Sequence, residues 1–248
     1  MIVERKLYSI YKKVSNIDLT PSYLIGHGKN NRLMGLNDNT IIDTHAFDYD
    51  LYLKYRNDVK DKDYAVFIDE CYPDHPDYIS SGFRSPVDEK HYYLNLCNYF
   101  DYFESFYKLD VVIAAHPRSN YMMNDKKFGG RKVVYNQTCQ LIRDSHIVLI
   151  HNSTSINFCV LFKKPMIFLK INRCIKDYYY NLLCLYLVIF RSSPSVTIDR
   201  PETFRLKEDI YNVDNEIYET YKEKYIKTNE SLDANTWDIV IDILPIIQ

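Results

Sequence analysis

The sequence predicts an α/β fold in which helices flank a parallel sheet. Short apolar runs at residues 111–115, 147–150 and 166–169 have the composition of buried strands. The segments between these runs have helical composition, and strands that alternate with helices are typical of a parallel sheet. Polar clusters follow the first two runs directly, reading HPRS and HNSTS. Because ligands of open α/β sheets bind beyond the carboxyl ends of the strands, these clusters lie where a ligand is expected.

The first 60 residues are expected to form a separate, partial segment. Residues 22–25 and 40–42 are predicted strands, and each runs into a polar or glycine-containing break. Residues 56–63 are charged and lack apolar periodicity, so they are interpreted as a linker. The resulting division is a short N-terminal addition over residues 1–60 and one α/β domain over residues 61–248.

Within the larger domain, residues 64–68 form a predicted buried strand that stops at Asp69 and Glu70. A proline-rich loop follows, and then Ser85 as cap and Pro86 in the first turn predict a helix that extends to about residue 107. After the third apolar run, residues 173–190 are expected to be helical and residues 195–198 to form an edge strand. Two more helices are expected at residues 213–226 and 234–247.

Composition excludes several classes of protein. The 248 residues carry a formal net charge of −2 with both signs mixed along the chain, which argues against nucleic acid as the main partner. The six cysteines are scattered along the chain without a CxxC motif, and this distribution is typical of a protein in a reducing compartment. No secretory signal and no apolar stretch of membrane-spanning length is visible. We therefore expect a cytoplasmic protein, either soluble or peripheral to the inner face of the membrane.

The HPRS cluster places His116, Pro117, Arg118 and Ser119 directly after a strand. Imidazole and guanidinium groups both donate to phosphate oxygens, and an imidazole beside a phosphoester stabilises the charge that builds as a leaving group departs. The alternative is a surface His-Pro turn that merely ends the strand. His75-Pro76 illustrates that alternative, because it occurs in a loop with no strand directly before it.

The HNSTS cluster places Asn152, Ser153, Thr154 and Ser155 at the cap and first turn of a predicted helix. A helix N-terminus presents free N–H groups, and hydroxyl side chains add donors, so this segment is a candidate phosphate seat. The alternative is that Ser153 or Thr154 only caps the helix. Both clusters follow consecutive apolar strands of the central region, so we expect them to converge on one edge and bind a phosphate-bearing ligand.

A family resemblance adds to this interpretation. HPRS, a helix with the pattern TCQLIRDS at 138–145, a strand, NSTS, and Lys164-Pro165 before the next strand together resemble the C-terminal half of GT-B glycosyltransferases. Within that group the chain is most similar to bacterial CMP-sugar-dependent sialyltransferases and Kdo transferases of capsule and lipopolysaccharide synthesis, over residues 64–200. The resemblance implies a Rossmann-like domain, a nucleotide-sugar donor and a glycan or glycolipid acceptor, without a further cofactor. It also implies that His116 contacts the donor phosphate and that Ser153 and Thr154 bind it.

This sequence differs from that family in its catalytic base. The family's base is an acidic residue of an N-terminal domain, and the first 60 residues here are too short to form such a domain. The acidic candidates are Asp69 and Glu70, and then Asp43, Asp48 and Asp50, although each also fits a turn or cap carboxylate. His45 together with these aspartates is a possible carboxylate-imidazole metal site. Exposed polar residues at a strand end account for the same sequence, and no metal is expected. Arg131, after a glycine pair, either reaches the donor or lies in a solvated turn.

Two other functions remain open at this point. One is a catalytically silent nucleotide-binding module that pairs with a separate chain carrying the N-terminal half. The other is an enzyme similar to the glycerophosphotransferases of teichoic-acid synthesis.

Overall fold

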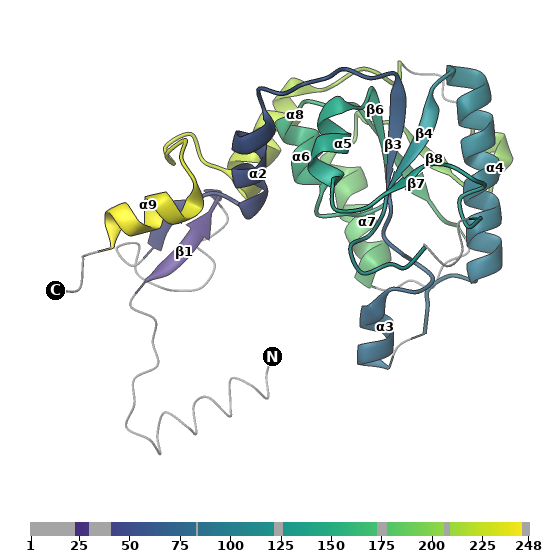
Figure 1. Cartoon of the computed structure of the whole chain (residues 1–248), viewed down its shortest axis with the longest axis horizontal. Coiled ribbons are helices and arrows are strands. Elements are labelled where there is room, and N and C mark those ends of the chain that lie inside the picture. The colour runs from purple at the N-terminus through teal and green to yellow at the C-terminus, as the bar shows by residue number, and fades with distance from the viewer. Residues whose placement is uncertain are drawn as a thin grey trace.

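A six-stranded parallel sheet forms the centre of the protein, which is described here by a computed structural model over residues 23–29, 41–82, 84–121, 126–172, 178–205 and 209–244 (Figure 1). The strand order is β5-β4-β3-β6-β7-β8. The strands are β3 (Tyr64–Ile68), β4 (Asp110–Ala114), β5 (Val133–Val134), β6 (Ile147–Ile150), β7 (Met166–Lys170) and β8 (Ser195–Thr197). The α/β class and the parallel sheet are confirmed.

The central strand β3 shows why the strands of this sheet have continuously apolar sequences. It pairs with β4 on one side and β6 on the other, with Phe67 opposite Ile113 and Leu149. Alternate side chains of β3 enter different cores: Phe67 belongs to one buried cluster, whereas Val66 belongs to the other. A strand covered on both faces has no polar side, so its sequence shows no alternation.

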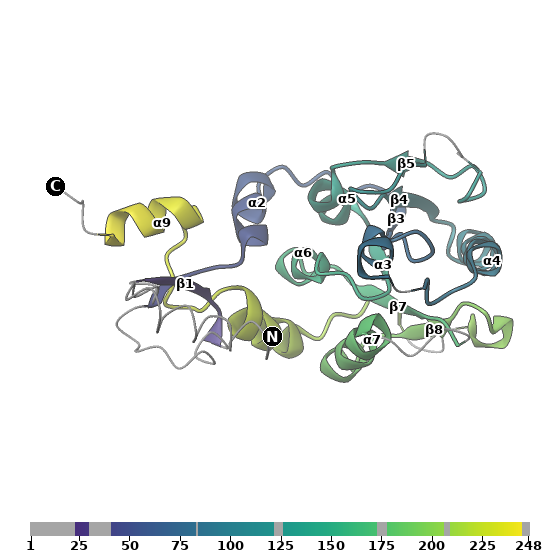
Figure 2. The ribbon, with the colours of Figure 1, turned by 90° about the horizontal axis from the view of Figure 1, so that it is seen from below.

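Helices cover both faces of the sheet (Figure 2). α4 (Glu89–Tyr107) packs on one face, and α5 (Thr138–Asp144), α6 (Ile156–Leu161) and α7 (Tyr178–Ile189) pack on the other. The short α3 (Pro76–Ser81) lies at the end of the sheet where β3 finishes. The flanking helices are therefore confirmed.

The N-terminus of α4 differs from the predicted one. Asp88, and not Ser85, is the cap residue, and its carboxylate accepts a hydrogen bond from the His91 N–H at 3.0 Å. The Ser85 hydroxyl instead donates to the carbonyl oxygen of Val87 at 2.8 Å. Both residue types cap helices well, so the local sequence did not separate them.

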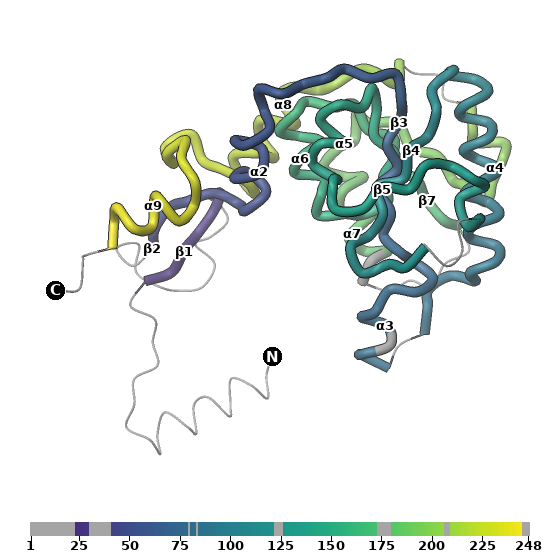
Figure 3. The backbone as a smooth tube through the Cα atoms, viewed as in Figure 1, coloured from purple at the N-terminus to yellow at the C-terminus, as the bar shows by residue number. Residues whose placement is uncertain are grey.

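A small second sheet lies apart from the main one (Figure 3). It pairs β1 (Leu24–His27) with β2 (Ile41–Thr44) in parallel, and the chain then enters α2 (Phe47–Tyr55). Helix α9 (Thr236–Ile243) packs on β2 through Ile42, Ile239 and Val240. β1 starts at Leu24, one residue after Tyr23, and the predicted strand residues Ser22 and Thr40 lie outside the described residues. The division at residue 60 stays a prediction.

The remaining C-terminal elements follow the expected order. β8 lies at the edge of the sheet as predicted. A 3₁₀ turn (Pro201–Thr203), α8 (Asn215–Tyr221) and a π-helical turn (Lys222–Ile226) then lead toward α9. The first five residues of the helix expected at 173–190 lie outside the described residues. In the part of the chain that the structure describes, no helix combines the length and the apolar character needed to cross a membrane.

Candidate functional site

The order of strands in the sheet places a candidate site at the carboxyl ends of β3 and β6. The chain begins the sheet with β3, adds β4 and β5 on one side, and then returns to place β6, β7 and β8 on the other. From β3 the chain continues to α4 on one face, whereas from β6 it continues to α6 on the opposite face. Connections that diverge in this way leave a crevice, which is where open α/β sheets bind ligands.

The two polar clusters predicted from the sequence share this edge, but their strands are not neighbours. HPRS follows β4 and HNSTS follows β6, and β3 lies between these strands. At the usual strand separation this places the two strand ends about 10 Å apart. The gap is bridged by the acidic pair at the end of β3, in which Asp69 bonds toward His116 and Glu70 bonds toward Ser153.

Glu70 carries the most unusual polar group at this edge. One oxygen, Oε1, is buried and has no hydrogen-bond partner in the described chain, while the carboxyl group hydrogen-bonds the Ser153 side chain. Burial raises the pKa of Glu70 to about 8, the Ser153 hydrogen bond opposes that rise, and the charge of Asp69 adds to it. At neutral pH the carboxyl group is therefore mostly protonated, with one oxygen unpaired among the described residues.

Asp69 has a different environment, although it is the adjacent residue. Its carboxylate accepts hydrogen bonds from the Cys71 N–H at 2.9 Å, the His116 N–H at 3.1 Å and the Tyr121 hydroxyl at 2.8 Å. Burial raises the pKa of Asp69, and these donors oppose the rise. Because its oxygens are engaged by these three donors, Asp69 holds the loops after β3 and β4 together.

His116 is half-buried and lies against a second histidine. The ring centroids of His116 and His75 are 4.9 Å apart, and His116 Nδ1 accepts a hydrogen bond from the Arg118 N–H at 3.3 Å. That bond places the proton of the neutral ring on Nε2. Burial lowers the pKa of His116, the nearby His75 and Arg118 lower it further, and Asp77 opposes them. At neutral pH His116 is therefore an uncharged ring with an Nε2–H donor.

His75 was not selected from the sequence, because no strand directly precedes it. It is buried, and its Nδ1 accepts a hydrogen bond from the Asp77 N–H at 3.2 Å. Burial also lowers the pKa of His75. The loop after β3 carries it onto the HPRS turn, which is a contact that only the sheet topology creates.

The rest of HPRS forms a turn that closes on itself. The backbone N–H of Ser119 donates to the His116 carbonyl oxygen at 2.9 Å, and the Ser119 hydroxyl donates to the same oxygen at 2.7 Å. Pro117 and Arg118 are exposed, and Arg118 forms an ion pair with Asp77 at 3.0 Å. The segment is thus a surface turn that carries a half-buried imidazole.

The first two residues of HNSTS, His151 and Asn152, are buried and hydrogen-bonded at the carboxyl edge of the sheet. His151 is fully buried, with Nδ1–H donating to the Leu169 carbonyl oxygen at 2.6 Å and Nε2 accepting from the Tyr92 hydroxyl at 3.1 Å. Burial lowers the pKa of His151 to about 4, so the ring is neutral. Asn152 is also buried, and its amide oxygen accepts a hydrogen bond from the Tyr72 hydroxyl.

The start of α6 differs from the expected phosphate seat. The cap residue is Ser155, which makes no side-chain cap bond, while the Ser153 hydroxyl accepts from the Ser155 N–H at 3.2 Å. The next three N–H groups, of residues 156–158, donate to the carbonyl oxygens of residues 153–155. The first-turn N–H groups are thus already used. The Thr154 hydroxyl is exposed, whereas the Ser153 hydroxyl is partly buried and hydrogen-bonds Glu70.

Several other polar residues singled out from the sequence have structural partners. Asp48 accepts from the Asn157 amide at 2.8 Å, Asp50 accepts from the Thr236 N–H at 2.8 Å, and His45 Nε2 bonds the Ala234 carbonyl oxygen at 2.7 Å. Arg131 is paired with Glu104 on α4 at 2.6 Å. Within the described ranges, no group of three or more His, Cys, Asp or Glu side chains is arranged to hold a metal ion.

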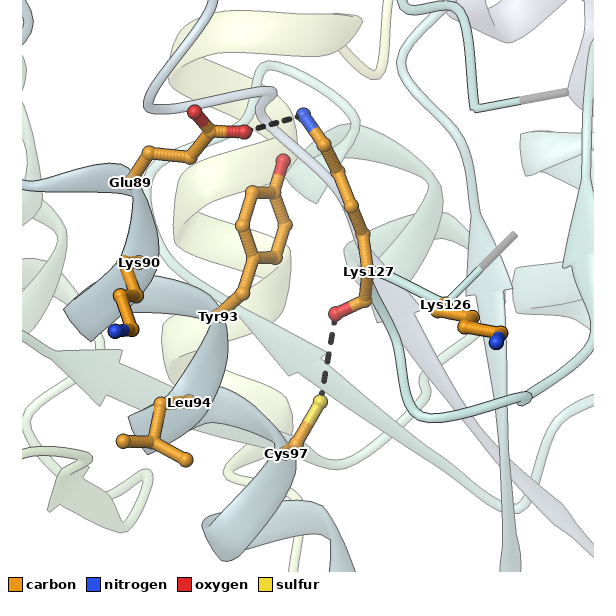
Figure 4. A pocket seen from close by; sticks show the side chains of 7 residues that line it. All are labelled: Glu89, Lys90, Tyr93, Leu94, Cys97, Lys126 and Lys127. Atoms are coloured by element: carbon orange, nitrogen blue, oxygen red, sulfur yellow. Dashed lines mark hydrogen bonds and ion pairs between the residues drawn. The ribbon is translucent and has the colours of Figure 1, made fainter. Parts of the chain in front are cut away.

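A shallow hollow of about 440 Å³ lies beside α4 and Lys127 (Figure 4). Lys127 Nζ forms ion pairs with Asp74 at 2.8 Å and Glu89 at 2.7 Å, and lies over the Tyr93 ring at 5.0 Å from its centroid. Tyr93 in turn contacts the Tyr121 hydroxyl, which donates to Asp69. The charge of Lys127 is thus already paired with two carboxylates. The contact from Tyr93 to Tyr121 helps to hold the Tyr121 hydroxyl on Asp69.

Comparisons with known proteins add little to this geometry. No protein-family model and no curated protein matches the sequence. The structure is similar to two solved structures of UDP-GlcNAc 2-epimerase from Methanocaldococcus jannaschii, one of them in complex with UDP-GlcNAc and UDP. Sequence identity is 16% and the TM-score 0.46 in both cases, over 90% of this chain. The chain spans 60% and 62% of the length of those two proteins, and a likeness of this size carries no argument about activity.

Proposed function

We propose that the chain binds a nucleotide sugar at the carboxyl edge of its sheet and transfers the sugar to an acceptor hydroxyl. The observation that carries this proposal is the buried, partnerless Oε1 of Glu70 at the point where the strand order reverses. A perturbed ionisable group in the crevice of an α/β sheet is typical of a ligand site.

The donors at this edge suit a phosphate group. Protonated Glu70 donates from Oε1 and is held by the Ser153 hydroxyl, Thr154 contributes an exposed hydroxyl group, and His116 contributes its Nε2–H. An anion that accepts a hydrogen bond from Glu70 favours the protonated carboxyl group, so binding and the raised pKa support each other. The phosphate of the donor is therefore assigned between the β4 and β6 clusters, above the end of β3.

The transfer step breaks the bond between the anomeric carbon and the phosphate oxygen and forms a bond from that carbon to the acceptor oxygen. The electron pair of the broken bond stays on the departing nucleotide phosphate. There, the Nε2–H of His116 and the protonated Glu70 stabilise the developing charge. Because Glu70 is protonated in this step, it is not the base, and the acceptor proton passes to an oxygen of the departing nucleotide phosphate.

The identity of the donor is a finer proposal that depends on the sequence motifs. HPRS and NSTS resemble the segments that contact cytidine nucleotides in CMP-sugar-dependent transferases, so the proposed donor is a CMP-linked acidic sugar. The proposed acceptor is a surface-polysaccharide or lipopolysaccharide glycan on the cytoplasmic side of the membrane. No cofactor is part of this proposal.

Isothermal titration with CMP, UMP, GDP and ADP tests the proposal. We expect CMP to bind best, and binding to weaken at least tenfold in both His116→Ala and Ser153→Ala. His146→Ala is a matched control, because His146 is exposed and precedes β6 at the opposite end of the strand. A preference for a purine nucleotide would reject the donor assignment. Unchanged CMP affinity in both edge variants would reject the site.

A second candidate, a nucleotide-binding module without transfer activity, is favoured by one observation. The described residues before β3 contain only a two-stranded sheet and α2, so no second Rossmann-like sheet faces the edge within the described residues. An assay of donor hydrolysis and sugar transfer with the purified chain separates the two candidates. CMP binding without either reaction supports the module, whereas turnover supports the enzyme.

A further inference from the structure

A separate cavity of about 260 Å³ lies on the same edge of the sheet, beyond the carboxyl ends of β7 and β8. Ile171 follows β7 directly and Ile198 follows β8, and both line the cavity together with Tyr92 of α4. Because β7 is the neighbour of β6, the cavity continues the row of strand ends that carries Glu70 and Ser153.

The lining of this cavity combines an apolar floor with hydrogen-bond acceptors. Ile198 and Tyr92 are buried, whereas Asp88, Asn95 and Asp199 contribute polar groups. Hydrogen bonds from His91 lower the pKa of Asp88, so this carboxylate is ionised at neutral pH. No lysine or arginine is among the described residues that line the cavity. The lining carries the carboxylates of Asp88 and Asp199, with His91 bonded to Asp88, and these carboxylates disfavour a phosphate or an acidic sugar.

The cavity is also fixed in shape. The Tyr92 hydroxyl donates to His151 Nε2 at 3.1 Å, which ties the floor to the start of the HNSTS segment. Asp199 Oδ1 accepts from the Asn172 N–H at 2.9 Å, which ties the loops after β7 and β8 together. A preformed cavity below the usual size for drug-like ligands suits one ring-sized group.

We propose that this cavity binds one neutral sugar ring of the acceptor glycan. A pyranose has apolar C–H faces that pack on the half-buried Ile171, and hydroxyl groups that donate to carboxylates such as Asp199. The inference rests on the proposed function for its role in transfer, because it places the acceptor beside the donor phosphate on one sheet edge. Binding of the sugar itself does not require the donor.

Amide chemical-shift mapping with methyl glucoside and methyl galactoside tests the inference on the full chain. We expect shifts at Tyr92, Ile171 and Ile198 in the wild type, and none there with N-acetylneuraminic acid. Asn95→Trp fills the cavity and should remove the shifts. Asn98→Trp is the matched control, since Asn98 is exposed three residues further along α4 and does not line the cavity. Asp199→Asn keeps an acceptor for the Asn172 N–H and should weaken binding about threefold to tenfold.

The outcomes separate this inference from the proposed function. Glycoside shifts that disappear in Asn95→Trp and persist in Asn98→Trp support the cavity. Absent shifts, shifts that persist in Asn95→Trp, or stronger binding of the acidic sugar overturn it. A CMP titration of the same samples reports on the donor site independently. CMP binding without glycoside shifts overturns only the cavity, and glycoside shifts without CMP binding overturn only the nucleotide-sugar proposal.

Discussion

Glu70 and Ser153 hydrogen-bond to each other across the point where the strand order of the sheet reverses. Glu70 follows β3, Ser153 follows β6, and their chains then diverge to opposite faces of the sheet. The contact leaves Glu70 Oε1 buried without a partner among the described residues. A buried carboxyl oxygen without a hydrogen-bond partner lowers the free energy of unfolding, and this effect can be measured.

Replacing Glu70 by glutamine should stabilise the protein at alkaline pH. The folded state holds the proton of Glu70 up to about pH 8, whereas the unfolded chain loses it near the ordinary value of 4.5. Between these values the unfolded state binds fewer protons, so wild-type stability falls as pH rises and then levels off above about pH 8. We expect Glu70→Gln to unfold with about 1–3 kcal/mol more free energy than the wild type at pH 9, and with a much smaller gain at pH 5. Urea denaturation at both pH values measures this, and a gain that is larger at pH 5 would contradict the burial of Glu70.

Asp69→Ala should destabilise the fold and weaken nucleotide binding together. The substitution leaves the Cys71 N–H, the His116 N–H and the Tyr121 hydroxyl without their acceptor. We expect a loss of about 2–4 kcal/mol in the free energy of unfolding. Tyr121→Phe removes only one of these bonds and should cost about 1 kcal/mol. Thermal unfolding of both variants checks the order, and equal losses would show that Asp69 does not hold the two loops.

His151 should make the protein sensitive to acid. Its pKa is about 4 in the folded state, below the usual 6.5 of a free side chain. Between these values the unfolded state binds more protons, so the stabilisation is complete above about pH 6.5 and is lost as pH falls toward 4. We expect His151→Gln to lose about 2–3 kcal/mol at pH 7.5 and to show a flatter decline from pH 6.5 to 4.5. Guanidinium titrations at three pH values measure both effects, and parallel declines would show that another group causes the acid loss.

Gly28 should tolerate no side chain, because two requirements meet there. Its φ is +66°, and a Cβ would lie 2.4 Å from the Lys224 carbonyl oxygen in the π-helical turn. Gly82 has a φ of +67° but no atom within 4 Å of the corresponding position, which makes it a matched control. We expect Gly82→Ala to cost about 1 kcal/mol from backbone strain alone, and Gly28→Ala about 2–4 kcal/mol. Urea denaturation compares the two variants, and equal costs would contradict the close approach of residue 28 to the turn.

Much of the sheet was predictable from the sequence because its strands are buried on both faces. Runs such as residues 64–68 and 147–150 are continuously apolar, and that pattern does not depend on what the rest of the chain does. Helix α2 was missed for the opposite reason: Phe47 and Leu51 are exposed and the buried contact is Tyr49, so its apolar periodicity is weak. The six-residue α3 is too short to leave a periodic signal.

The candidate site was predictable only as a set of residue types at strand ends. His116, Glu70 and Ser153 were selected because polar residues directly follow apolar runs. Which of them meet depends on strand order, and β3 lies between β4 and β6 although it precedes both in the sequence. The contact of His75 with His116 and the Glu70–Ser153 bond arise from that order, and no local pattern encodes it.

The pH dependence of CMP binding tests the central claim most directly, because the claim is that a protonated Glu70 contacts the phosphate. Above about pH 7 the phosphate of CMP no longer changes its charge, so a further change reports on the protein. We predict that affinity measured by isothermal titration falls about tenfold between pH 7.5 and pH 9 in the wild type. In Glu70→Gln, where the amide donates at every pH, affinity should stay constant over that range. A wild-type affinity that does not change, or an equal fall in Glu70→Gln, would contradict the account.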